Sequence, residues 1–285
     1  MPDDRTLAVE AAQAAGELAL GYFGGAVETW EKGPNNPVCE ADLALDRLLH
    51  ERLLGARPAY GWLSEETADD AERLGRRRLW VVDPIDGTRD FLRGRTGWAV
   101  SVALVEDGVP ILAALYAPAR QQFFVAEAGK GATLNGAPIR IGGCDSVAGC
   151  RIPADISTIG ASYWPERWDA AAVEKPNGLA LRIAKLAIDE ADAFFEGRPM
   201  GEWDIAAAAL ILSEAGGTIT DREGAPLRFN KPVPRLRGVI AAVPAIHGEV
   251  LRRVGRGIAA INALRRPGGP GAGRSRSSGS DPSRP

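Results

Sequence analysis

The sequence predicts an α+β protein, and three patterns along the chain lead to this class. Residues 6–23 and 41–54 carry apolar side chains at helical spacing, which predicts two amphipathic helices near the start. Residues 79–128 contain short apolar runs separated by turns, which predicts a meander of antiparallel strands. From residue 178 onward helical and strand patterns alternate, so the second half of the chain is expected to mix both kinds of element.

Turn and helix-end signals place these elements in order. A Gly-Gly pair at residues 24–25 ends the first helix, and turns at residues 106–108 and at Pro118 separate the strands of the meander. The Asn-Gly pair at residues 135–136 is typical of a hairpin turn. The later predicted elements are helices at residues 178–196, 203–217 and 247–264, and strands at residues 218–221 and 238–243.

The composition is that of a soluble globular protein. Of the 285 residues, 45% are hydrophobic and 25% are charged, and the formal net charge is −3. The basic residues form no folded stripe, so no nucleic-acid polymer is expected as a partner. Cys39, Cys144 and Cys150 show no CxxC spacing, which indicates neither a disulfide framework nor a zinc site.

We expect one domain over residues 1–264, with halves of approximately 1–140 and 141–264, followed by a disordered tail at residues 265–285. The tail has almost nothing to bury, because it consists mainly of Gly, Ser, Pro and Arg. The first residues are acidic and amphipathic, and no apolar run reaches the roughly 20 residues of a membrane span. A cytoplasmic protein is therefore expected.

The segment WVVDPIDGTRD at residues 80–90 ends an apolar run in two aspartates. Asp83 and Asp86 can point into one pocket, and Gly87 lets the backbone approach a ligand closely. A helix that starts near Thr88 would direct free N–H groups toward an anion. Carboxylates beside amides suit a metal-bound phosphate, because Mg²⁺ prefers hard oxygen ligands. The alternative is a turn in which Asp86 caps the following helix.

Three other acids stand where a predicted element begins or ends. Glu65 follows a short apolar run, Asp204 precedes a strongly apolar helix, and Asp42 precedes the second helix. Each has an alternative explanation, Glu65 as part of a solvated loop and the two aspartates as helix caps. Lys32 stands alone, without the glycine spacing of a P-loop.

Four segments with acidic residues follow one another in a fixed order: a lysine with ADLALD, then SEE, then WVVDPIDGT, and finally EWDIAAAALILSEAGG. Together they resemble the inositol monophosphatase superfamily of Mg²⁺-dependent, lithium-sensitive phosphomonoesterases. The resemblance covers residues 5–264 and implies a layered αβαβα sandwich. It also implies a phosphoric monoester hydrolase that acts on a small phosphorylated metabolite and often forms a homodimer.

The resemblance implies a cofactor of two or three Mg²⁺ ions and assigns the site residues by position. The implied metal ligands are Glu65, Asp83, the backbone carbonyl of Ile85, Asp86 and Asp204, with Asp42 near a third, weaker ion. The implied substrate contacts are the backbone amides of Gly87 and Thr88, together with Arg89 and Asp204. Hydrolysis is expected through metal-activated water without a covalent intermediate, and the expected catalytic residues are Glu65, Asp86 and Thr88.

The residues after the Asp-Gly-Thr motif favour one substrate class within the superfamily. Arg89-Asp90-Phe91 and the Glu202 that precedes Trp203 resemble the 3′(2′),5′-bisphosphate nucleotidase branch. Adenosine 3′,5′-bisphosphate, which would yield AMP and phosphate, is therefore the expected substrate, and inositol 1-phosphate is the alternative. Arg89 and Asp90 can also be explained as a solvent-facing pair on a helix.

Three further residues leave alternatives open. Glu196 lies close to where the inositol enzymes hold a sugar hydroxyl, although a plain surface glutamate explains it more simply. Lys175 and Arg182 are candidates for binding a second phosphate, or equally solvated cations near helix ends. Two other classes of protein stay open, a non-catalytic metal- and nucleotide-binding regulator and an α/β scaffold whose acids are only caps. The complete acidic set argues against the regulator.

Overall fold

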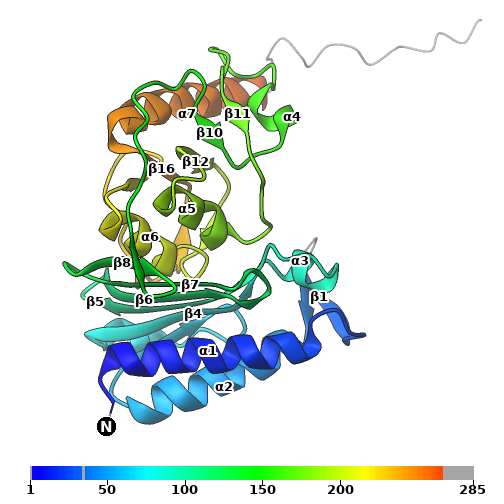
Figure 1. Ribbon diagram of the computed structural model, residues 1–285, viewed down its shortest axis with the longest axis vertical. Coiled ribbons are helices and arrows are strands. Elements are labelled where there is room, and N and C mark those ends of the chain that lie inside the picture. The colour runs from blue at the N-terminus through cyan, green and yellow to red at the C-terminus, as the bar shows by residue number, and fades with distance from the viewer. Residues whose placement is uncertain (1, 34–35, 266–285) are drawn as a thin grey trace, which may run out of the picture.

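The computed structural model describes residues 2–33 and 36–265, and their helices and sheets stack in the order αβαβα (Figure 1). Helices α1 (Asp4–Tyr22) and α2 (Glu40–Ala56) cover one face of a seven-stranded sheet. Helices α5 (Leu179–Ala187) and α6 (Ala206–Glu214) cover its other face. A three-stranded sheet and the long helix α7 (Pro244–Arg265) complete the stack. The predicted α+β class and the αβαβα sandwich are confirmed.

The large sheet contains the predicted meander. Its order is β3-β4-β5-β6-β7-β8-β9, with β3 and β4 parallel and every other pair antiparallel. The strands are β3 (Gly61–Ser64), β4 (Arg78–Asp86), β5 (Ala99–Glu106), β6 (Val109–Ala117), β7 (Gln122–Glu127), β8 (Gly131–Leu134) and β9 (Ala137–Ile139). Asn135 and Gly136 have φ angles of 51° and 82°, so the predicted hairpin turn is confirmed.

The small sheet corrects one sequence prediction. Its order is β12 (Ala193–Glu196), β16 (Val239–Ala242) and β14 (Thr218–Asp221), and both pairs are antiparallel. A single helix was predicted for residues 178–196, but the helix ends at Ala187 and β12 follows. Asp189 has a φ angle of 59°, which interrupts helical geometry, and the aromatic pair at residues 194–195 is well suited to strand pairing.

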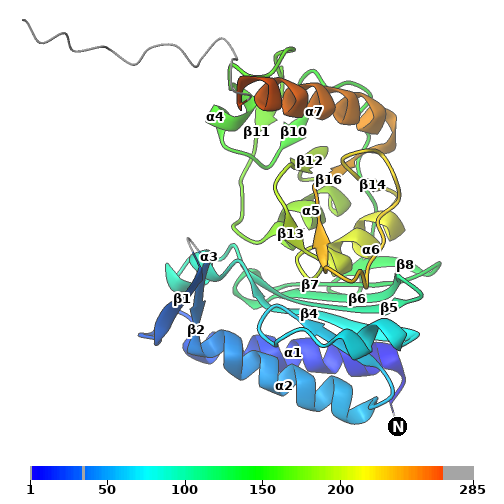
Figure 2. The ribbon, with the colours of Figure 1, turned by 180° about the vertical axis from the view of Figure 1, so that it is seen from behind.

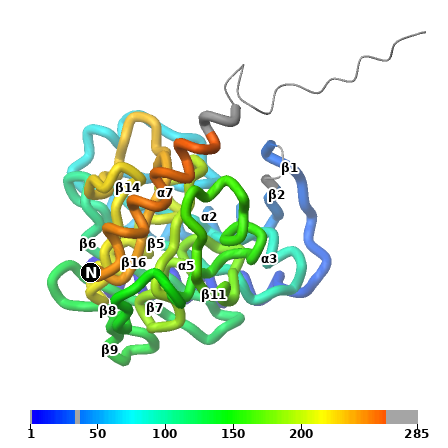
Figure 3. Tube along the Cα trace, turned by 90° about the horizontal axis from the view of Figure 1, so that it is seen from above, coloured from blue at the N-terminus to red at the C-terminus, as the bar shows by residue number. Residues whose placement is uncertain are grey.

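The remaining elements are short and lie mostly in the connections. They are β1 (Thr29–Gly33), β2 (Asn36–Cys39), η1 (Ala71–Gly75), α3 (Thr88–Leu92), η2 (Pro118–Arg120), β10 (Arg151–Ile152), α4 (Ile156–Ile159), β11 (Ala171–Ala172), β13 (Met200–Gly201) and β15 (Arg235–Leu236). The views from behind and from above show the β1–β2 hairpin beside α3 (Figures 2 and 3). Apart from Arg265, which ends α7, the predicted tail lies outside the described residues.

An apolar core fills each interface between layers. The largest core lies between the large sheet and the α5–α6 layer, and it also includes residues of the small sheet. Helix α6 is buried from Ala206 to Leu212, because sheets cover it on both sides. This burial explains why its sequence is apolar all round. The division of the domain near residue 140 stays a prediction. Among the described residues, no helix is long and apolar enough to cross a membrane.

Two buried charged side chains hold the loop at residues 230–231 beside the large sheet. Arg73 donates from Nη1 to Asn230 Oδ1 at 2.6 Å and from Nη2 to the Lys231 carbonyl at 3.0 Å. Glu202 is fully buried and accepts from the backbone amides of Asn230 at 2.6 Å and Lys231 at 3.1 Å. Glu202 therefore fixes this loop from a position two residues before Asp204.

We expect Glu202→Gln to lower the free energy of unfolding by about 1–3 kcal/mol, because an amide NH₂ replaces part of the acceptor that faces two buried N–H groups. Urea denaturation measures this change. Glu10→Gln, on the exposed side of α1, is the matched control and should leave stability unchanged. Equal midpoints for the two variants would contradict the role assigned to Glu202.

Candidate active site

The ends of two neighbouring strands bring the predicted acidic residues together. Strands β3 and β4 are parallel with Ser64 opposite Val82, so Glu65, directly after β3, lies beside Asp83 in β4. Glu65 N donates to the Val82 carbonyl at 3.2 Å, which fixes this register at the edge of the sheet. Asp204 reaches the same place from the turn before α6.

One cavity of 330 Å³, here called the acidic pocket, collects most of the predicted site. Its lining includes Glu65, Asp83, Ile85, Asp86, Gly87, Thr88, Arg89 and Asp204. Among the predicted site residues only Asp42 is not in the lining. The structure thus places side chains from β4, from the end of β3 and from the start of α6 around one space.

Three of these carboxylates form a group that could hold a cation. Ligand oxygens of Glu65, Asp83 and Asp204 lie within 4.8 Å of one another. Asp83 Oδ1 accepts from the Ile85 amide at 3.0 Å, but Oδ2 is buried and has no hydrogen-bond partner among the described residues. An unpartnered buried carboxylate oxygen is costly, and a cation would satisfy it. The donor set is entirely oxygen, which suits a hard divalent ion.

The pKa values of two carboxylates in the acidic pocket are raised, as expected for buried groups of like charge. Burial raises the pKa of Asp83 well above its usual range, and the charges of Glu65 and Asp86 raise it further. Burial also raises the pKa of Asp204, again reinforced by Asp86 and Glu65. A divalent cation would reverse these effects, because it favours the charged form of each carboxylate.

Asp86 is a helix cap, but not of the helix considered from the sequence. Its Oδ1 accepts from the Leu179 amide at 2.9 Å and its Oδ2 from the Ala180 amide at 2.8 Å. Asp86 therefore caps α5 across the layer boundary, while Gly87 precedes α3. Burial raises the pKa of Asp86 to about 6, although the two amides oppose this shift. A carboxylate has further lone pairs, so capping leaves acceptor capacity toward the pocket.

Gly87 and Thr88 form the turn between β4 and α3. Gly87 has a φ angle of 102°, and a Cβ atom there would lie 2.7 Å from the Gly97 carbonyl oxygen, so only glycine fits. Thr88 Oγ1 lies 3.1 Å from the Ile85 carbonyl oxygen and 3.3 Å from Asp42 Oδ1. The turn is thus packed tightly on both sides.

Asp42 is buried next to Thr88 and takes part in the cap of α2, in agreement with the alternative explanation. Asp42 Oδ2 accepts from both the amide and the thiol of Cys39 at 2.8 Å. The carboxylate is only 1% exposed, and burial raises its pKa. Its assignment to a third metal ion stays a prediction.

For three other residues, the alternative explanation as a helix cap or as a surface residue is wrong. Asp204 accepts from the Gly201 amide at 2.7 Å, and α6 begins after Ile205 without a side-chain cap, so Asp204 does not cap that helix. Asp90 is not solvent-facing, because it accepts from the Asn177 amide at 3.0 Å. Glu196 is not a plain surface residue, since its side chain is 15% exposed and pairs with Arg198 at 2.8 Å.

Lys32 is a site residue whose place the sequence did not reveal. Its Nζ lies 3.1 Å from Glu65 Oε1 and 2.7 Å from Glu66 Oε1. Burial raises the pKa of Glu66 to about 7, although Lys32 opposes this shift. The only signal was the lysine in the family segments, because nothing local marks a residue of β1 as a neighbour of β3.

Arginines surround the carboxylates. Arg89, Arg182, Arg198 and Arg235 line the acidic pocket. Arg182 is only 7% exposed, so it is not a solvated helix-end cation, and burial lowers its pKa. Its Nε and Nη2 donate to the carbonyls of Pro176 at 2.7 Å and Asn177 at 2.8 Å. Arg198 and Arg235 were not predicted, because they lie in connections without a recognisable motif.

Known proteins are similar to this chain in sequence. The family model described as the inositol monophosphatase family matches residues 3–258. An inositol-1-monophosphatase of Rhizobium meliloti is 36% identical over 201 residues, which cover 68% of this chain and 75% of that protein. A Nus factor SuhB of Xylella fastidiosa is 32% identical over 228 residues, which cover 76% of this chain and 81% of that protein.

Solved structures show the same architecture. An inositol monophosphatase of Thermotoga maritima aligns with a TM-score of 0.80 at 27% identity, over 91% of this chain and 100% of that one. The SuhB protein of Bartonella henselae aligns with a TM-score of 0.75 at 28% identity, over 89% of this chain and 98% of that one. The chain therefore belongs to the inositol monophosphatase family of metal-dependent phosphatases and is a phosphoric monoester hydrolase.

Proposed function

We propose that the protein is a Mg²⁺-dependent phosphomonoesterase whose substrate is a 3′(2′),5′-bisphosphate nucleotide, with adenosine 3′,5′-bisphosphate yielding AMP and phosphate. One observation carries the proposal: a group of carboxylates, one of which has an unpartnered buried oxygen, lines the same pocket as four arginines. One phosphate monoester and two divalent ions do not need so many guanidinium groups. A substrate with a second phosphate makes use of them.

The residues of the acidic pocket have distinct proposed roles. Glu65, Asp83, Asp86, Asp204 and the Ile85 carbonyl hold two Mg²⁺ ions. When bound, these ions act as Lewis acids on the phosphate and lower the pKa of water. The amides of Gly87 and Thr88 hold phosphate oxygens, Arg89 and Asp204 contact the substrate, and Glu65 accepts a proton from the attacking water.

Two further residues position the catalytic side chains of the acidic pocket. Lys32 orients Glu65, since its Nζ lies 3.1 Å from Glu65 Oε1. Asp42 lies 3.3 Å from the Thr88 hydroxyl, and we propose that it keeps that hydroxyl toward the attacking water. A third, weaker Mg²⁺ ion near Asp42 is part of the proposal, and Mg²⁺ titration of Asp42→Asn by calorimetry would count the ions.

Inositol 1-phosphate is the second candidate substrate, because relatives such as the Rhizobium meliloti protein are named inositol-1-monophosphatase. Glu196 also supports it, since a half-buried carboxylate near the pocket can accept from a sugar hydroxyl. A substrate with a single phosphate makes use of fewer of the arginines that line the acidic pocket.

We expect Asp83→Asn to lower kcat/KM for phosphate release by at least about 100-fold, because an amide is a poor ligand and repels the cation with its NH₂ group. The matched control is Asp107→Asn, in an exposed turn between β5 and β6. Phosphate release with saturating Mg²⁺ measures both. Full activity in Asp83→Asn would contradict the placement of the ions.

We expect the affinity for Mg²⁺ to rise from pH 5.5 to pH 7.5. The pKa values of Asp83 and Asp204 are raised and that of Asp86 is about 6, so at low pH protons compete with the cation. The metal-free protein should lose stability over the same rise, because carboxyls with raised pKa stabilise the folded state most below the unfolded pKa. Calorimetric titrations in buffers of different ionisation enthalpy detect the released protons. An affinity independent of pH would contradict the role of these carboxyls.

We expect faster phosphate release from adenosine 3′,5′-bisphosphate than from inositol 1-phosphate at equal concentration, and none from either without Mg²⁺. Faster release from inositol 1-phosphate would overturn the substrate assignment but not the phosphatase activity. Binding of Mg²⁺ and nucleotide without release from any of a broad panel of phosphate monoesters would favour the regulator instead.

Three expectations from the resemblance remain proposals. Lithium should inhibit phosphate release in competition with Mg²⁺, which a steady-state assay measures. A homodimer should be visible by light scattering of the purified chain. A cytoplasmic location should be visible by fractionation of cells that express the protein.

A further inference from the structure

The loop at residues 64–67, here called the acidic loop, carries Glu65 into the acidic pocket. It directly follows the edge strand β3, so the sheet supports it from one side only, where the Glu65 amide donates to the Val82 carbonyl at 3.2 Å. The charges of Asp83 and Asp204 repel that of Glu65. Contacts outside the pocket must therefore hold the acidic loop in place.

A carboxylate of α2, that of Asp46, binds both ends of the acidic loop. Its Oδ1 accepts from Ser64 Oγ at 2.5 Å, and its Oδ2 accepts from Thr67 Oγ1 at 2.6 Å. Both distances are in the range of charge-assisted hydrogen bonds from a hydroxyl to a carboxylate. Asp46 is only 8% exposed, so water competes little for these contacts. One buried side chain thus joins the two residues that flank the glutamate pair.

The two hydroxyls that donate to Asp46 also accept hydrogen bonds within and beside the acidic loop. Ser64 Oγ accepts from the Glu66 amide at 3.3 Å, which fixes the backbone bend of the loop. Thr67 Oγ1 accepts from Trp62 Nε1 at 3.4 Å. A hydroxyl can donate one hydrogen bond and accept others, so the contact with Asp46 orients both hydroxyls for these partners. The acidic loop is therefore held by a connected network that starts at Asp46.

We propose that Asp46 is a positioning residue for the divalent cation, because it holds Glu65 in the acidic pocket through the two residues that flank the glutamate pair. Asp46 is not part of the pocket lining. It therefore leaves both oxygens of Glu65 to the ion, unlike Lys32, which lies 3.1 Å from one of them. This inference rests on the proposed metal-dependent function and adds a residue that preorganises a metal ligand from outside the pocket.

Calorimetric titration with Mg²⁺ in the absence of substrate tests this role without a catalytic step. Asp46→Asn should weaken Mg²⁺ binding by about tenfold, because an NH₂ group replaces one of the two oxygens that accept from the acidic loop. Thr67→Val keeps the shape of the side chain and removes one of the two hydroxyls. It should weaken Mg²⁺ binding by about threefold, as expected for the loss of one hydrogen bond.

Asp4→Asn is the matched control, because Asp4 is also a helix carboxylate that accepts from a hydroxyl. Its Oδ2 accepts from the Tyr60 hydroxyl at 2.8 Å and from Arg78 Nη1 at 2.9 Å. Tyr60 precedes β3 and Arg78 begins β4, so Asp4 lies at the opposite ends of the same two strands. Asp4→Asn should lower stability in urea without changing the affinity for Mg²⁺. If Asp46→Asn behaved in the same way, its role would be structural only and the inference would be overturned.

A double-mutant cycle shows whether Asp46 acts through Glu65. Glu65→Ala removes the ligand that Asp46 is proposed to position, so adding Asp46→Asn to this variant should weaken Mg²⁺ binding by less than about twofold further. Titration to millimolar Mg²⁺ measures both variants. Additive effects would show that Asp46 acts on the ion by another route and would overturn the inference.

Hydrogen exchange in EDTA reports on the acidic loop itself, without any metal. The amides of Glu65 and Glu66 donate to the Val82 carbonyl and to Ser64 Oγ. Their exchange should be faster in Asp46→Asn than in the wild type, because the loop opens more often once one of its contacts is lost. Asp4→Asn should leave this exchange unchanged. Unchanged exchange in Asp46→Asn would contradict the proposed contact between α2 and the loop.

The outcomes separate this inference from the proposed function. Equal Mg²⁺ affinity in the wild type, Asp46→Asn and Thr67→Val, with normal phosphate release, would overturn the inference and leave the phosphatase intact. Weaker Mg²⁺ binding and faster loop exchange in Asp46→Asn, without phosphate release by the wild type from any of a broad panel, would support the inference and overturn the proposed function. No Mg²⁺ binding by the wild type would overturn both.

Discussion

The mutual repulsion of three carboxylates is the constraint on which the rest of the site depends. Oxygens of Glu65, Asp83 and Asp204 lie within 4.8 Å, where two unit charges repel by about 3–4 kcal/mol at an effective dielectric constant of about 20. Without a cation, burial and then this repulsion favour the protonated forms, so the pKa values of Asp83 and Asp204 are raised. The surrounding structure must hold the three groups together despite this repulsion.

Two different parts of the fold hold the three carboxylates. The β3–β4 ladder fixes Glu65 and Asp83, and the Gly201 amide fixes Asp204 at 2.7 Å. Asp204 also precedes a helix that is buried between two sheets, so it cannot move without disturbing the largest core. The site therefore draws on the stability of the whole sandwich, and the buried contacts of Glu202 extend that support to the next loop.

The sequence predicted what depends on local pattern. The meander followed from alternation and turns, and the metal-site candidates followed from acids at the ends of apolar runs. The prediction of one helix for residues 178–196 was wrong, because pairing of β12 with β16 overrides the local preference. Asp86 was suspected as a cap of the helix that follows it, but it caps α5 instead, because the packed fold brings residues 179–180 to it. Lys32 was missed for the same reason, whereas Arg198 was missed because it lies in a connection without a recognisable motif.

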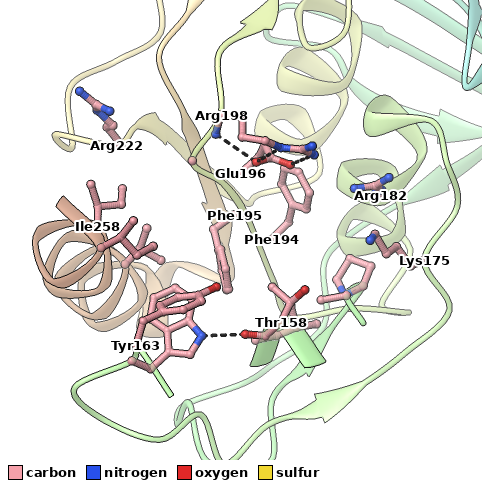
Figure 4. A pocket seen from close by; sticks show the side chains of 17 residues that line it. Thr158, Tyr163, Lys175, Arg182, Phe194, Phe195, Glu196, Arg198, Arg222 and Ile258 are labelled. Carbon is pink, nitrogen blue, oxygen red and sulfur yellow. Dashed lines mark hydrogen bonds and ion pairs between the residues drawn. The ribbon is translucent and has the colours of Figure 1, made fainter. Parts of the chain in front are cut away.

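Helix α5 lies between the acidic pocket and a neighbouring cavity of 520 Å³ (Figure 4), and this position has a consequence for catalysis. Its first amides donate to Asp86 in the acidic pocket, and one turn later Arg182 lines both cavities. Arg182 also donates to the carbonyls of Pro176 and Asn177, so the start of the helix and the shared arginine form one rigid unit. A ligand bound to Arg182 would therefore lie at a fixed position relative to Asp86. Because a small misplacement of the reacting atoms costs much of the rate, this link between Arg182 and Asp86 helps to keep the two residues in register.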